Sequence, residues 1–166
     1  MQRFWLDADV LIQAKRVYPS DVFPGFWTLL IEQNALQVIK SPIEVFRELA
    51  EYGDELSAWV KDQRDGNFFI EPDQKVQATF TEIADFVNDN YPRPQAKDFL
   101  AGADPWVIAH AKCEPGTVVT SERLVGPGSQ QAKIPNICRE FEVEWINTCD
   151  MFRELGVSFA VKIKGK

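Results

Sequence analysis

Carboxylates placed beside apolar segments are the side chains of this sequence best suited to chemistry. Asp7 separates two apolar runs, Phe4–Leu6 and Val10–Ile12, inside what is otherwise one hydrophobic stretch. A carboxylate there is costly to bury unless a cation or a metal pairs with it, and its simpler alternative is a loop-capping role at the strand end. Asp9 lies two residues further on, where it either joins the same site or caps the following helix. The chemistry indicated is the binding of a cation.

A further candidate lies on the helix expected over 41–52. Ser41 followed three residues later by Glu44 is typical of a capping box, with Pro42 at the first helical position. This interpretation gives Glu44 a structural role. Glu48 lies one turn further along the same face without such a role, so it becomes the candidate, with a solvated surface glutamate as the alternative.

Asp104 and Glu122 complete the set of candidate carboxylates. Asp104 precedes Pro105 at the start of a predicted helix, which makes it an N-cap as well as a candidate ligand. The two roles are compatible because one oxygen can cap while the other binds metal. Glu122 follows the apolar run 117–120, so a buried strand would deliver it to the edge of a sheet.

Short apolar runs alternate with amphipathic segments between these residues, which is typical of an α/β fold. Strands are expected at 4–6, 36–39, 68–70, 117–120 and 143–146. Helices are expected at 22–34, 41–52, 55–63, 76–90, 96–101, 104–112, 134–141 and 151–155. Strands separated by helices form a parallel sheet covered on both faces, whose sites form where the carboxyl ends of the strands open into a crevice. Asp7 and Glu122 are expected at such an edge.

Composition and charge narrow the classes of function. The 166 residues suffice for one α/β domain. A net charge of −7 counts against a protein that binds nucleic acid through phosphate contacts alone, but not against an enzyme whose bound cations supply the positive field. No apolar run approaches the roughly 18 residues of a membrane span, and no signal-peptide pattern is present, so a cytoplasmic location is expected.

Histidine and cysteine chemistry are poorly supported. His110 is the only histidine, so neither a zinc-binding histidine pair nor a nucleophile-elbow triad fits the sequence. Cys113, Cys138 and Cys149 are odd in number and widely spaced, which argues against a disulfide framework and a structural zinc site.

The order of the acidic residues resembles that of the PIN domain, the nuclease fold of VapC-type toxins in toxin–antitoxin pairs. The likeness rests on four motifs in this order: Leu6-Asp7-Ala8-Asp9-Val10-Leu11-Ile12, Glu48-Leu49, Asp104-Pro105-Trp106-Val107-Ile108-Ala109-His110-Ala111 and Thr120-Ser121-Glu122. It extends over essentially the whole chain. Two departures are Glu122, where the family usually has Asp, and Asp9, where Asn, Ser or Thr is usual.

The resemblance implies one PIN-like domain over 1–166, with a helical insert at about 55–97. Its fold would be a three-layer α/β/α sandwich with a central, mainly parallel twisted sheet. Its activity would be that of a metal-dependent endoribonuclease, the toxin of a toxin–antitoxin pair. The partners implied are RNA as substrate, an antitoxin protein and a second copy of the chain, with no membrane.

The resemblance also assigns roles to residues. Carboxylate oxygens select hard cations, so Mg²⁺ or Mn²⁺ is expected rather than zinc. The catalytic and metal-binding residues would be Asp7, Glu48, Asp104 and Glu122, with Asp9 as a further candidate ligand. Asp7 and Asp104 would be the primary ligands. Candidates for contact with the substrate are Thr120, Arg123 and Lys133.

Two other functions stay open. A haloacid-dehalogenase-like phosphatase would draw its nucleophile, acid and phosphate-binding groups from Asp7, Asp9, Thr120 and Lys133. Against it, Leu11 stands where that pattern wants Thr or Val. The other alternative is a catalytically weak or inactive interaction protein that keeps the PIN scaffold.

Overall fold

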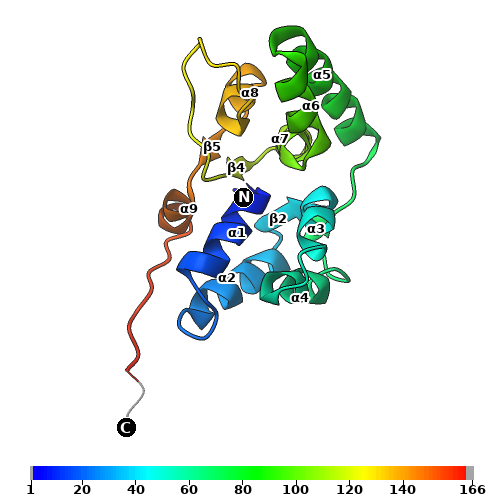
Figure 1. The fold of residues 1–166 in the computed structure, drawn as a ribbon. Helices are drawn as coiled ribbons and strands as arrows, with labels where there is room; N and C mark the ends of the chain where they lie inside the picture. Colours follow the sequence, from blue (N-terminus) through cyan, green and yellow to red (C-terminus); the bar gives the residue numbers. More distant parts are fainter. Residues whose placement is uncertain (1, 164–166) are drawn as a thin grey trace.

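A computed structural model describes residues 2–163, which fold around one parallel β-sheet (Figure 1). The strands are β1 (Phe4–Leu6), β2 (Ile39–Pro42), β3 (Phe69–Ile70), β4 (Thr117–Val119) and β5 (Trp145–Ile146). They lie in the order β3-β2-β1-β4-β5, and each neighbouring pair is parallel. The predicted α/β fold with a parallel sheet is confirmed.

Helices cover both faces of this sheet. They are α1 (Ala8–Val17), α2 (Pro24–Ala35), α3 (Ile43–Ala50), α4 (Glu55–Asp62), α5 (Gln74–Asn90), α6 (Arg93–Ala101), α7 (Asp104–Cys113), α8 (Ile134–Glu140) and α9 (Thr148–Glu154). Helix α7 packs on β1, β2 and β4, with α5, α6 and α8 around it, whereas α1 to α4 lie on the other face (Figure 1). The result is the predicted three-layer sandwich. Within residues 2–163, no helix is long and apolar enough to cross a membrane.

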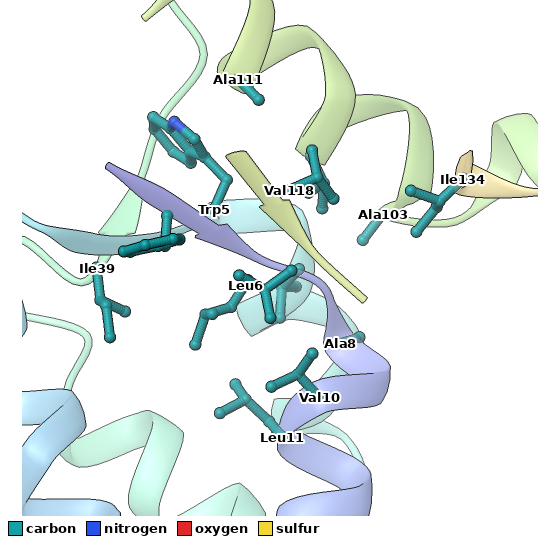
Figure 2. Packing of buried hydrophobic residues seen from close by; sticks show 14 of the residues in the cluster. Trp5, Leu6, Ala8, Val10, Leu11, Ile39, Ala103, Ala111, Val118 and Ile134 are labelled. Atoms are coloured by element: carbon teal, nitrogen blue, oxygen red, sulfur yellow. The ribbon is translucent and has the colours of Figure 1, made fainter. Parts of the chain in front are cut away.

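Strand β1 is buried on both faces, as expected for the centre of a parallel sheet. Trp5 and Leu6 are both 0% exposed. Figure 2 shows Trp5 and Val118 on the side of α7, and Leu6 and Ile39 on the opposite side. Because this apolar strand ends at Leu6, the chain places Asp7 at the carboxyl edge of the sheet.

Strand β2 begins later than the sequence predicted. The predicted strand was 36–39, but Leu36 and Gln37 form the turn that ends α2, where Gln37 has a φ of 60°. The strand then runs through Ser41, a residue predicted to begin the next helix. The apolar run 36–39 indicated the position of the strand only approximately, because the left-handed turn at Gln37 delays its start to Ile39.

The segment 55–97 was expected as a helical insert, and it also extends the sheet. It contains α4, α5 and the start of α6, but it supplies the edge strand β3 between them. Strand β3 pairs with β2 at Ser41 and Phe69. Helix α5 packs against α7, so the segment supports the helix on which Asp104 lies.

Candidate metal centre

The order of the strands reverses beside β1. The chain passes from β1 to β2 and β3 on one side, then returns to β4 and β5 on the other. In open parallel sheets, ligands bind at the carboxyl ends of the strands that flank such a point. Asp7 follows β1 directly and Thr120 follows β4 directly, so the fold places both there.

Asp7 is held from two sides and is only 2% exposed. Its Oδ2 accepts a hydrogen bond from the Thr120 hydroxyl at 2.7 Å, and its Oδ1 accepts one from the backbone N–H of Asp9 at 3.2 Å. Burial raises the pKa of Asp7 to about 7 against the lowering effect of these two hydrogen bonds, and the charges of Asp9 and Glu122 add to the rise. Asp7 therefore caps α1 in surroundings that disfavour its negative charge.

Asp104 is the first residue of α7, and its predicted N-cap role is wrong. The N-cap is Ala103, which makes no side-chain hydrogen bond. Burial raises the pKa of Asp104 to about 8. Four carboxylates contribute to the rise by repulsion, in decreasing order Asp7, Glu122, Glu48 and Asp9. The rise occurs although a helix N-terminus favours a negative charge, so burial and repulsion outweigh the helix dipole.

Glu48 and Asp9 lie at the rim of this cluster. Glu48 projects from α3 toward Ala103. The backbone N–H of Ala103 donates a hydrogen bond to the Glu48 carboxylate, which lowers the pKa of Glu48. Partial burial nevertheless raises the pKa of Glu48 above its usual value, and the charge of Asp9 adds to this. The side chain of Asp9 accepts a hydrogen bond from the Ser121 hydroxyl at 3.1 Å. The segments that follow β1 and β4, together with α1, α3 and α7, thus bring acidic residues together.

Glu122 differs from Asp7, Asp9, Glu48 and Asp104 because it forms an ion pair with a basic side chain. Oε1 lies 2.8 Å from Lys133 Nζ, and Oε2 accepts a hydrogen bond from the backbone N–H of Ile134 at 2.7 Å. The ion pair with Glu122 is the main cause that raises the pKa of Lys133, and the charges of Asp104 and Asp9 act in the same direction. In this conformation Glu122 binds the first backbone N–H of α8 and holds the ammonium group of Lys133 beside the cluster.

The donor set fits a hard divalent cation. Asp7, Asp9, Glu48 and Asp104 form no salt bridge with any residue between 2 and 163. Carboxylate oxygens are the ligands that Mg²⁺ and Mn²⁺ prefer, and such a cation would relieve the repulsion. In the described part of the chain no three acidic, histidine or cysteine side chains already form a metal-binding group. Binding would therefore involve rotation of these side chains.

A comparison with protein families finds one family model that spans the whole arrangement. The model of the family described as domain of unknown function (DUF4411) matches residues 4–159. The chain belongs to this family. A search of curated proteins finds no match. The DUF4411 match extends from β1 through α9, so it includes every carboxylate of the cluster.

Glu44 is a carboxylate of the DUF4411 domain that the sequence analysis set aside wrongly. The predicted capping box does not form: the N-cap of α3 is Pro42, and the Ser41 hydroxyl donates to the carbonyl oxygen of Leu6 at 2.7 Å. Glu44 Oε1 lies 3.3 Å from Arg47 Nη1, while its buried Oε2 has no hydrogen-bond partner among residues 2–163. Burial raises the pKa of Glu44.

Of the other residues considered in the sequence analysis, Thr120 and His110 are buried and Arg123 is exposed. Thr120 is 1% exposed and its hydroxyl donates to Asp7, so it orients a carboxylate. Arg123 is exposed on the loop after β4. His110 is buried in the last turn of α7, at the other end of the helix from Asp104. Its ring stacks on Trp5 with ring centroids 4.7 Å apart, and burial lowers its pKa to about 4.

Two clefts flank the carboxylates. The first, of about 590 Å³, lies on the β4 side and includes Ser121, Glu122 and Arg123 in its lining. The second, of about 490 Å³, lies on the β2 side and includes Glu44 and Glu48. Because β1 lies between β2 and β4, Asp7 lies between the two clefts. An extended ligand can therefore pass over the cluster and occupy both.

Proposed function

We propose that this chain is a metal-dependent endoribonuclease that hydrolyses RNA phosphodiester bonds at the carboxylate cluster. One observation carries the proposal: Asp7 and Asp104 lie at the sheet's switch point, and burial and repulsion from neighbouring carboxylates raise the pKa of both. Apolar side chains would pack there at lower cost. Carboxylates kept in such surroundings are characteristic of functional sites.

The roles of the residues follow from their contacts. Asp7, Asp104 and Glu48 would hold Mg²⁺ or Mn²⁺, with Asp9 as an additional ligand. When bound, such a metal lowers the pKa of a coordinated water and neutralises charge on the attacked phosphate. The hydroxyls of Thr120 and Ser121 orient Asp7 and Asp9.

Lys133 supplies the positive charge that the protein itself brings to this site. Glu122 holds its ammonium group at 2.8 Å, beside the charges of Asp104 and Asp9. In that position the ammonium group is suited to bind a non-bridging oxygen of the attacked phosphate. Glu122 is then a positioning residue, which differs from its predicted role as a ligand.

A polymer is favoured over a small substrate because open clefts lie on both sides of the cluster. The choice of RNA rests on the resemblance to PIN nucleases. The same resemblance supports a cytoplasmic toxin, an antitoxin protein as partner, and a homodimer. The net charge of −7 favours an antitoxin whose contacting surface is basic.

Cleavage of a 5′-labelled single-stranded RNA tests the proposal. Fragments should form with Mg²⁺ or Mn²⁺ and disappear with a chelator. The substitution Asp104→Asn should slow cleavage at least about 100-fold, because even residues behind the ligands of a metal cost 10–100-fold. Asp98→Asn is the matched control, since Asp98 is exposed on α6. Undiminished cleavage by the Asp104 variant would sink the assignment.

The two alternatives give different results in the same preparation. A phosphatase would hydrolyse p-nitrophenyl phosphate, and this activity would depend on Asp7 and Asp9. Leu11, which stands where the phosphatase pattern has Thr or Val, counts against it. A non-catalytic interaction protein would cleave neither RNA nor the phosphate ester, with or without metal.

A further inference from the structure

The 590 Å³ cleft continues directly from the candidate metal centre. Thr120, Ser121 and Glu122 form part of its wall, and each of them also contacts the carboxylate cluster or belongs to it. Residues of α1 and of the start of α9 also line this cleft. A cavity of this volume has the size of a small-ligand site. A ligand bound here would therefore lie next to the reacting phosphate.

The lining of the cleft combines apolar surface with a few polar groups. Apolar contacts come from Ala14, Leu124 and Trp145. Gln13 and Arg123 are exposed residues of this lining, and neither side chain forms a hydrogen bond or ion pair with another residue between 2 and 163. Both side chains are therefore available to a ligand.

We infer that this cleft binds the nucleobase next to the scissile phosphate and prefers a purine, an inference that rests on the proposed ribonuclease function. A flat base matches apolar walls that include the half-buried Trp145, because bases splayed out of a strand stack on aromatic side chains. Arg and Gln both form paired hydrogen bonds with the edges of purines. Arg123 also brings positive charge to a protein that is acidic overall.

The geometry also explains how one chain would both hold and cut RNA. The base occupies the cleft on the β4 side, and the phosphate that follows it lies over Asp7 and Lys133. The strand then continues toward the second cleft, beside Glu48. Recognition and cleavage would thus use adjacent parts of one carboxyl edge.

Indole N–H signals of the full chain test the inference without requiring cleavage. The chain has five tryptophans, and Trp145→Phe identifies the signal of Trp145. In Mg²⁺ buffer, AMP or GMP should shift this signal saturably, with CMP and UMP binding more weakly. The signal of Trp5, whose indole N–H donates to the carbonyl oxygen of Glu114 and which does not line the cleft, should stay unchanged.

Substitutions at the two polar side chains test the recognition itself. Arg123→Ala or Gln13→Ala should raise the Kd of the preferred purine nucleotide at least about fivefold, the lower end of the effect of a lost base contact. Arg16→Ala is the control, because Arg16 is exposed on α1 outside the cleft. Purines and pyrimidines of equal affinity would contradict recognition by Arg123 and Gln13.

The outcomes separate this inference from the function on which it rests. If no nucleotide shifts the Trp145 signal while RNA is cleaved with dependence on Asp104, the base site is overturned and the ribonuclease stands. If purine nucleotides shift the signal but no RNA is cleaved, the binding cleft is supported and the ribonuclease is overturned.

Discussion

The two ends of the central strands both gather charged side chains, but only one end balances them. Near the amino ends of β1 and β4, Glu114 lies 2.6 Å from Arg3 and 3.2 Å from Lys40. The ammonium group of Lys40 also lies 5.9 Å from the ring centre of Trp5. At the carboxyl ends, Asp7 and Asp104 have no basic partner within residues 2–163.

We interpret the difference as that between a stabilising cluster and the proposed metal centre. At the amino end each charge meets an opposite charge, so removing one leaves another unpaired and costs stability. At the carboxyl end like charges meet, so removing one should relieve repulsion in the metal-free protein while harming the activity. The two ends differ in this way if removing a carboxylate charge lowers stability at the amino end and raises it at the carboxyl end.

The largest expected effect is on cleavage. Asp7→Asn should reduce metal-dependent RNA cleavage at least about 100-fold, because it removes a charged ligand. Glu114→Gln should keep most of the wild-type rate, since Glu114 lies at the other end of the strands. Initial rates under saturating Mn²⁺ measure both. Similar losses in the two variants would remove the distinction between the two ends.

A smaller effect is expected on stability at the amino end. Glu114→Gln should lower the free energy of unfolding by about 1–3 kcal/mol, because Arg3 and the nearly buried Lys40 lose their charged partner. Glu71→Gln is the control: Glu71 is paired with Arg47 on the surface, and its loss should change little. Urea unfolding of both variants measures the difference, and equal midpoints would show that the amino-end cluster is not stabilising.

The ammonium group of Lys133, at the carboxyl end of the strands, should have an intermediate effect. Lys133→Met should lower the cleavage rate by about tenfold, corresponding to one charge-assisted hydrogen bond to phosphate. Lys133→Arg should keep most of the rate, since it preserves the charge. If the Met variant cleaves as fast as wild type, Lys133 serves only to neutralise Glu122.

The smallest expected effect concerns pH. The folded-state pKa of Asp104 is raised to about 8, so the folded state holds this proton more tightly than the unfolded chain. Stability of the metal-free protein should therefore fall as the pH rises from about 4 to about 8. Asp104→Asn should gain stability relative to wild type as the pH rises from 5 to 9, and should be the more stable protein at pH 9. A less stable variant at pH 9 would contradict the repulsion.

Patterning in the sequence was sufficient to predict the fold because apolar runs mark buried strands. Strand β1 and helix α7 lie where their residues indicated, and so does the carboxylate of Asp7. The capping roles predicted for Asp9, Ser41 and Asp104 are wrong, since the N-caps of α1, α3 and α7 are other residues. Ser41 is held in β2 by its bond to Leu6, and Asp104 begins α7 without capping it. These outcomes depend on tertiary contacts that the local sequence does not contain.

The candidate site was predictable only in part for the same reason. Order along the chain and the resemblance brought Asp7, Glu48 and Asp104 forward together. The ion pair between Glu122 and Lys133 bridges eleven positions of an irregular loop, and no periodic pattern fixes such a contact. Glu44 was missed because a plausible local motif supplied a structural role that the tertiary structure does not use.

Calorimetric titration of Mn²⁺ into the full chain tests the central claim most directly. The wild-type protein and Glu114→Gln should bind Mn²⁺ with similar affinity, whereas Asp7→Asn and Asp104→Asn should lose most of that binding. The absence of Mn²⁺ binding to the wild type, or equal binding by all four proteins, would contradict a metal centre at the carboxyl edge of the sheet.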